Sequence, residues 1–109
     1  MLRTHNCGQL TAGDVEKEVT LCGWVASRRD HGKLIFIDLR DRYGLTQVTF
    51  LPKDSPKAYE SAVNLRSEFV VRLKGKVNLR PKGTINPRIT TGEIEVLARD
   101  QTALFEKRT

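Results

Sequence analysis

The sequence predicts an all-β fold, a five-stranded Greek-key barrel with a helix between strands three and four and a short N-terminal helix. Three observations predict it. Five segments alternate between apolar and polar residues or are rich in β-branched and aromatic residues. Turns containing glycine and aspartate separate the first three segments. A single long segment has the apolar spacing of a helix instead.

The first strand follows a short helix. Thr11 and Asp14 have the spacing of a capping box, with aspartate in the place of glutamate. The strand begins at Val19 with VTLCGWVASRR, and the glycine within it predicts a bend or bulge. A turn over residues 30–33 (DHGK) leads into the second strand over residues 34–40 (LIFIDLR).

The remaining elements follow in order. A second turn over residues 41–44 (DRYG) precedes a third strand over residues 45–51. The helix begins near Ser55, where Pro56 suits a first turn. The fourth strand covers residues 69–79, with Val71, Leu73, Val77 and Leu79 on its inner face, and a basic loop over residues 80–92 leads to the fifth strand over residues 93–98.

Five strands with a helix in this position fit the OB-fold, which binds oligonucleotides around its second and third strands and in the adjoining loops. An SH3-like barrel is the main rival, but it does not account for the helix. We assign residues 1–98 to the barrel and residues 99–109 to the start of a linker.

Composition excludes several classes. The chain has 109 residues and a mean hydropathy of −0.42, and no apolar run approaches the ~20 residues of a membrane span. The N-terminus shows no secretory signal, so we expect a cytoplasmic protein. Cys7 and Cys22 form no CxxC motif, and Cys22 is predicted to be a small core residue. His5 and Cys7 lack a second pair of ligands, so we expect no metal site.

Charge points to a polyanionic partner. Nineteen basic residues against thirteen acidic residues give a net charge of +6 and a pI near 9.7. An ordinary domain that happens to be basic has the same composition, so this alternative stays open.

The second strand carries an anomaly. Ile35, Ile37 and Leu39 face the core, which leaves the phenyl ring of Phe36 on the outer face. If residues 30–33 form a four-residue loop, Arg29 pairs with Leu34. If the second turn is even-numbered, the outer face collects a mixed set of side chains: Arg29, Phe36, Asp38, Arg40 and Gln47.

These residue types suit single-stranded RNA. An exposed ring stacks on an unpaired base, and the Gln47 amide offers a donor and an acceptor to a base edge. Glu95 can accept from the N1–H and amine of guanine. Phosphate contacts are expected from the basic side chains of the hairpin and of the long loop: Arg28, Arg29, Arg80, Lys82 and Arg88.

Plainer interpretations stand beside this one. Phe36 can be covered by the N-terminal segment or a neighbouring domain. Gln47 can be an ordinary strand residue, and Glu95 can simply keep an edge strand soluble. The basic loop can be a solvated loop.

The sequence also resembles the N-terminal anticodon-binding domain of bacterial aspartyl-tRNA synthetases. The resemblance rests on NCGQL at residues 6–10, VTLCGWVASRRDHGKLIFIDLRDRYGLTQV at residues 19–48 and TGEIEVLA at residues 91–98. The blocks agree in order and spacing and cover essentially the whole chain.

The resemblance implies a role for each matching residue. It implies that Phe36 stacks on the middle anticodon base, uracil, and that Gln47 reads that base. Glu95 would read the first-position guanine or its queuine-type derivative, and Arg29 and Arg80 would lie near the third base.

Two departures weaken the third-base contacts: Ser27 replaces a frequent arginine, and Thr84 replaces an asparagine of the basic loop. His31 and Gly83 resemble the bacterial type that charges both aspartate and asparagine tRNAs, whose anticodons differ only in a third-position cytosine or uracil.

The resemblance also implies a parent enzyme, a class II homodimer that attaches aspartate to tRNA(Asp), and in the type just described also to tRNA(Asn). ATP and Mg²⁺ would act in a catalytic domain outside this segment, and no cofactor and no catalytic residue is expected within it. The competing functions are a freestanding OB module that binds single strands without sequence choice and a structural barrel that contacts proteins or the ribosome.

Overall fold

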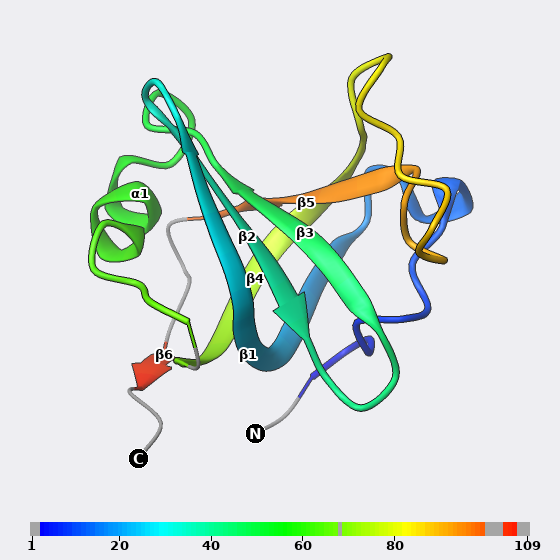
Figure 1. The fold of residues 1–109 in the computed structure, drawn as a ribbon, viewed down its shortest axis with the longest axis horizontal. Helices are drawn as coiled ribbons and strands as arrows, with labels where there is room; N and C mark the ends of the chain where they lie inside the picture. Colours follow the sequence, from blue (N-terminus) through cyan, green and yellow to red (C-terminus); the bar gives the residue numbers. More distant parts are fainter. Residues whose placement is uncertain (1–2, 68, 100–103, 107–109) are drawn as a thin grey trace.

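The chain forms a small barrel of strands with one helix against it (Figure 1). The structure is a computed structural model, and it describes residues 3–67, 69–99 and 104–106. The elements in chain order are η1 (Ala12–Asp14), β1 (Glu18–His31), β2 (Leu34–Arg40), β3 (Leu45–Phe50), α1 (Pro56–Ala62), β4 (Val70–Leu79), β5 (Ile94–Ala98) and β6 (Leu104–Glu106).

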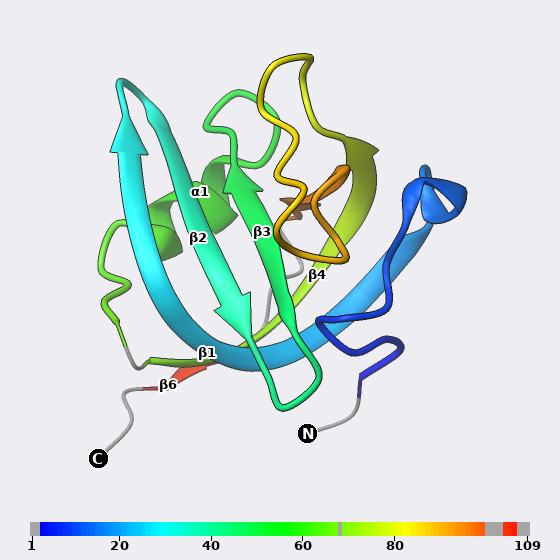
Figure 2. The same cartoon turned by 45° about the vertical axis from the view of Figure 1, so that its right-hand side comes forward.

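The barrel closes because β1 is long enough to pair twice. Its N-terminal half pairs with β4, and its C-terminal half pairs with β2. β2 pairs with β3, β3 runs parallel to β5, and β5 pairs with β4, which completes the ring (Figure 2). A register shift between Val25 and Ser27 marks a bulge where β1 changes partner. The predicted five-stranded OB barrel, with a helix between β3 and β4, is confirmed.

The core follows the predicted alternation. Buried residues from every barrel strand, from α1 and from the turn after α1 fill the interior: Val19, Leu21, Val25, Ile35, Ile37, Leu39, Val48, Phe50, Ala58, Ala62, Leu65, Val71, Leu73, Val77, Ile94 and Val96. Leu79, predicted to face inward, is 52% exposed because it ends β4 beyond the core. Cys7, and not Cys22, is fully buried.

The β1–β2 turn is shorter than predicted. His31 pairs with Leu34, which leaves a two-residue loop of Gly32 and Lys33. Gly32 has φ +59, as the first central residue of a type II′ turn requires. Arg29 therefore lies opposite Phe36 and not opposite Leu34. A shift of two residues leaves every side chain on its predicted face.

Other local predictions hold. Arg40 pairs with Leu45, so the second turn has four residues, an even number. η1 is a single 3₁₀ turn, and the Asp14 carboxylate accepts from the Thr11 N–H at 2.9 Å.

Within the segment assigned to a linker, β6 pairs with β4, which the sequence did not predict. None of the helices in the described ranges has the length and apolar character needed to cross a membrane.

Candidate nucleic-acid interface

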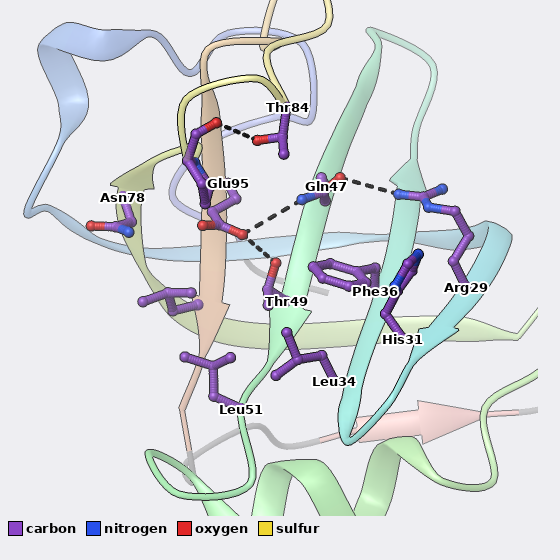
Figure 3. A pocket seen from close by; sticks show the side chains of 12 residues that line it. Arg29, His31, Leu34, Phe36, Gln47, Thr49, Leu51, Asn78, Thr84 and Glu95 are labelled. Atoms are coloured by element: carbon purple, nitrogen blue, oxygen red, sulfur yellow. Dashed lines mark hydrogen bonds between the residues drawn. The ribbon is translucent and has the colours of Figure 1, made fainter.

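A pocket of about 560 Å³ lies on the outer face of β2 and β3 (Figure 3). The β1–β2 hairpin bounds one side, and β5 with the loop that follows β4 bounds the other. Its lining combines one phenyl ring with polar and aliphatic side chains: Arg29, His31, Leu34, Phe36, Gln47, Thr49, Leu51, Asn78, Pro81, Thr84, Glu95 and Leu97.

Phe36 lies at the centre of this lining and outside the core. Its ring is partly exposed, because its side chain points away from the buried Ile35 and Ile37. His31 meets the ring edge-on, with 6.3 Å between centroids and an interplanar angle of 78°. The pocket thus contains an aromatic surface held from one side and open to a ligand.

A hydrogen-bonded polar row crosses the sheet beside this ring. Gln47 Oε1 accepts from Arg29 Nη2 at 3.1 Å, and Gln47 Nε2 donates to Glu95 Oε1 at 3.5 Å. The Thr49 hydroxyl donates to the same carboxylate oxygen. Gln47 and Glu95 are only 7% and 5% exposed. Their burial contradicts the interpretation of both as ordinary solvent-facing strand residues.

Asp38 holds Arg29 in place. Arg29 Nη1 donates to Asp38 Oδ2 at 2.7 Å, Nη2 lies 3.3 Å from Oδ1, and the Ser27 hydroxyl donates to Oδ2 at 2.6 Å. Burial alone would raise the pKa of Asp38, but these hydrogen bonds and the Arg29 charge hold it below its ordinary value. Asp38 therefore stays ionised and orients the cationic end of the polar row.

The loop after β4 forms the far wall. Arg80 Nε donates to the Ile94 carbonyl at 2.9 Å, and Nη1 donates to the Thr84 carbonyl at 3.2 Å. Burial lowers the pKa of Arg80, although the charges of Asp38 and Glu95 act against that shift. The Thr84 N–H donates to the Pro81 carbonyl across a tight turn, in which Gly83 has φ +91, a conformation that favours glycine. Thr84 lines the pocket, whereas Arg80 and Gly83 support the loop beside it.

Arg28, predicted to contact phosphates, points away from the pocket. Its Nη1 donates to the carbonyls of Ala62, Val63 and Leu65 at 2.8–2.9 Å, and its Nε donates to Asp30 at 2.8 Å. Adjacent strand residues face opposite sides of a sheet, so Arg28 reaches the end of α1 while Arg29 reaches the pocket.

Several lining residues were missed by the sequence analysis. Leu34 lies two residues before Phe36, and Leu97 lies two residues after Glu95, so strand parity would have found both. Asn78 pairs with Glu95 across β4 and β5, a register that no local pattern reveals. Leu51 and Pro81 come from loop geometry. Within the described ranges, no group of three or more His, Cys, Asp or Glu residues could hold a metal ion.

Known proteins resemble this chain in sequence. A family model of the tRNA anti-codon family, described as an OB-fold nucleic acid binding domain, matches residues 19–102. The aspartate–tRNA(Asp/Asn) ligase of Geotalea uraniireducens is 58% identical over 90% of the chain. The enzyme of the same name from Moorella thermoacetica is 56% identical over 98% of the chain. The chain spans 16% and 18% of the lengths of these two relatives.

Solved structures resemble the fold. Asparaginyl-tRNA synthetase from Pyrococcus horikoshii, complexed with asparaginyl-adenylate, superposes with a TM-score of 0.79 at 24% identity, over the whole chain and 24% of that protein. An OBody bound to hen egg-white lysozyme superposes with a TM-score of 0.81 at 22% identity, over 99% of each chain. The sequence resemblance to aspartyl-tRNA synthetases is confirmed, and the chain belongs to the tRNA anti-codon family of OB-fold nucleic acid binding domains.

Proposed function

We propose that the pocket binds the unpaired bases of a tRNA anticodon loop. The observation that carries the proposal is the partly exposed Phe36 ring beside a hydrogen-bonded row of Arg29 and the buried Gln47 and Glu95. A ring face holds a base of any sequence, whereas a fixed carboxylate and amide discriminate among base edges. A nucleic-acid binder without sequence choice gains nothing from a buried carboxylate, because the charge repels phosphates.

Each polar side chain has a role in this proposal. The middle base, uracil, stacks on Phe36, and Gln47 hydrogen-bonds its edge. Both protein hydrogen bonds to the Glu95 carboxylate end on Oε1, so we assign Oε2 to the N1–H and amine of a first-position guanine. Arg29, Arg80 and Thr84 lie nearest the third base.

The same proposal extends to the third position. His31 lines the pocket, and Gly83 shapes the turn that carries Thr84. We propose that contacts there tolerate cytosine and uracil alike, so that both the tRNA(Asp) and the tRNA(Asn) anticodon are bound. The relatives named for tRNA(Asp/Asn) support this reading.

The parent protein in this proposal is an aspartate–tRNA ligase. Residues 1–98 form its anticodon-binding domain, and residues 99–109 begin the connection to a catalytic domain that uses ATP and Mg²⁺. The parent acts in the cytoplasm as a homodimer. The curated relatives support the ligase, since each is an aspartate–tRNA(Asp/Asn) ligase that matches this chain over a small part of its length. A freestanding nucleic-acid-binding module is not favoured.

Fluorescence anisotropy with labelled RNA stem-loops tests the proposal. The 109-residue chain should bind a stem-loop with the anticodon GUC more tightly than one with the anticodon AUC. The reason is that adenine lacks the two donors of guanine that meet Glu95. Glu95→Gln should remove most of this preference, about 1–3 kcal/mol, or roughly fivefold to 150-fold in Kd. Glu93→Gln is the matched control, because Glu93 is exposed and lines no part of the pocket.

Two results would each contradict one part of the proposal. Equal affinity of the unsubstituted chain for GUC and AUC loops would remove the base-reading role of Glu95. A large loss of affinity on changing GUC to GUU would leave recognition of the anticodon intact but exclude tolerance at the third position.

A further inference from the structure

A second groove continues the base-binding pocket. It has a volume of about 260 Å³ and is lined by Lys33, Leu34, Leu51, Pro52, Lys53 and Asp54. Leu34 and Leu51 line both the groove and the pocket, so the two form one continuous depression. In Figure 3 these two leucines lie beyond Phe36, at the end of the pocket away from Thr84 and Glu95.

Two chain connections build this groove from opposite sides. Leu34 starts β2 directly after the tight turn at Gly32 and Lys33. On the other side β3 ends at Phe50, and the Leu51 carbonyl accepts from the N–H groups of Asp54 and Ser55 at 3.2 and 3.0 Å. These bonds turn the chain toward α1 and leave the Leu51 side chain on the floor of the groove. The floor is therefore set by backbone geometry.

The groove combines an apolar floor with a cationic rim. Its exposed lining is apolar, while the side chains of Lys33 and Lys53 are exposed at its edge. The only acid of the lining, Asp54, accepts from Arg99 Nη1 at 3.1 Å, which offsets its charge. A ligand that fits has one flat apolar part and a negative charge next to it. An unpaired nucleotide has both.

We propose that this groove is a subsite for one further unpaired nucleotide, the one that flanks the anticodon on its 5′ or its 3′ side. Its base packs on Leu34 and Leu51, and its phosphate meets Lys33 or Lys53. This subsite rests on the proposed function, because RNA must already occupy the pocket. The apolar floor offers a base no hydrogen bond, so the subsite accepts any base and lengthens the bound strand without reading it.

Abasic substitutions in the RNA test the base contact. GUC stem-loops are prepared with an abasic residue at the loop position immediately 5′ or immediately 3′ of the anticodon. One of the two should bind the 109-residue chain about threefold to tenfold more weakly, as expected for the loss of one buried apolar contact. In the Leu51→Ala variant, the same abasic residue should change Kd very little. Exchanging the base at that loop position for another base should also change Kd little in every variant.

Salt dependence tests the phosphate contact. The slope of log Kd against log salt concentration falls by about 0.7 for each lost contact to single-stranded RNA. A fall of this size is expected for Lys33→Ala or Lys53→Ala. Lys74→Ala is the matched control, because Lys74 is exposed on β4 and lines neither the pocket nor the groove.

The outcomes separate the subsite from the anticodon site. The subsite is overturned if neither abasic residue weakens binding, or if the loss is the same in Leu51→Ala. A strong preference for one base at that position also overturns it. In these cases the dependence on Glu95 and on a first-position guanine is unchanged, so the proposed function stands. If the Leu51→Ala variant does not fold, the subsite is tested by salt dependence instead. It is overturned if the salt slopes of both Lys33→Ala and Lys53→Ala equal that of Lys74→Ala. Loss of the GUC preference in the unsubstituted chain contradicts both proposals.

Discussion

At the scale of single residues, Phe36 combines two roles that are normally separate. Its backbone belongs to a central strand of the barrel, yet its ring lies on the outer face and contacts His31 edge-on. Removing a fully buried phenylalanine lowers the free energy of unfolding by about 3–5 kcal/mol. Removing a partly exposed ring lowers it far less, so Phe36 can be tested for binding without loss of the fold.

Phe36→Ala should weaken binding of a GUC stem-loop by about 1–3 kcal/mol, the contribution of stacking on one base. The midpoint of thermal unfolding should change little. Tyr43→Ala is the matched control, because Tyr43 is 57% exposed, lies on the β2–β3 turn and is not part of the pocket. Unchanged affinity, or a fall in the midpoint as large as that of Phe50→Ala in the core, would contradict the role of Phe36.

Asp38 should make stability depend on pH. Its folded-state pKa lies below the ordinary value of about 3.9. The carboxylate therefore stabilises the fold fully above the unfolded-state pKa, and this stabilisation is lost as the pH falls through the folded-state pKa.

Asp38→Asn tests this linkage. At neutral pH the variant should have a free energy of unfolding about 1 kcal/mol lower than the unsubstituted chain. The difference should shrink as the pH falls below about 4. Denaturant titrations at a series of pH values measure it, with Glu93→Gln as the control for an exposed carboxylate. A difference that stays constant down to acid pH would show that the Arg29–Asp38 pair is not the cause.

At the scale of elements, the β1–β2 hairpin carries two neighbouring arginines with different tasks. Arg29 faces the pocket, and Arg28 faces the end of α1, where its guanidinium donates to the carbonyls of Ala62, Val63 and Leu65. The helix is only seven residues long. Its attachment to the barrel therefore depends on tertiary contacts such as this one.

Substitution of Arg28 and Arg88 should give opposite results. Arg28→Ala should lower the free energy of unfolding by about 1–3 kcal/mol, because it removes three hydrogen bonds that attach the end of α1 to the barrel. Its direct effect on RNA affinity should be small. Arg88→Ala should leave stability unchanged, because Arg88 is exposed in the loop after β4, and should weaken RNA binding. Unfolding curves and stem-loop titrations of both variants test this, and equal RNA losses would return Arg28 to the phosphate-contacting set.

Strand parity explains why so much of the pocket could be predicted. The apolar alternation of residues 35–39 fixes which side chains face out, and the wrong turn length at residues 30–33 did no harm because it shifted the register by two. Arg28 shows where the charge argument and strand parity differ. Charge assigned it to the RNA face, whereas parity alone would have placed it on the other face.

At the scale of the whole molecule, long-range pairing was beyond the sequence. The burial of Glu95 depends on β5 lying beside both β3 and β4, which brings it to Thr49 and Gln47 from more than forty residues away. The alternation of residues 93–98 predicts the face of β5 on which Glu95 lies, but not which residues surround it. The same holds for β6, whose partner β4 lies over thirty residues earlier in the chain.

The distribution of charge over the molecule should determine how binding depends on salt. Away from the pocket, two lysines have acidic partners: Lys17 with Asp14 and Lys76 with Glu16, each at 2.9 Å. Around the pocket, Arg80 uses its guanidinium on backbone carbonyls, and Lys82 and Arg88 are exposed. We therefore expect the loop after β4 to contribute phosphate contacts through Lys82 and Arg88.

Measuring Kd for a GUC stem-loop over a range of salt concentrations tests this distribution. Contacts from Lys82 and Arg88, together with one from Lys33 or Lys53, would give a slope of log Kd against log salt of about 2, at about 0.7 per contact. Lys82→Ala should lower the slope by about one contact, whereas Lys76→Ala should leave it unchanged, because Lys76 already has an acidic partner. Equal reductions in the two variants would mean that RNA follows the overall charge of the barrel and not the pocket, since only a localised footprint separates two lysines of the same formal charge.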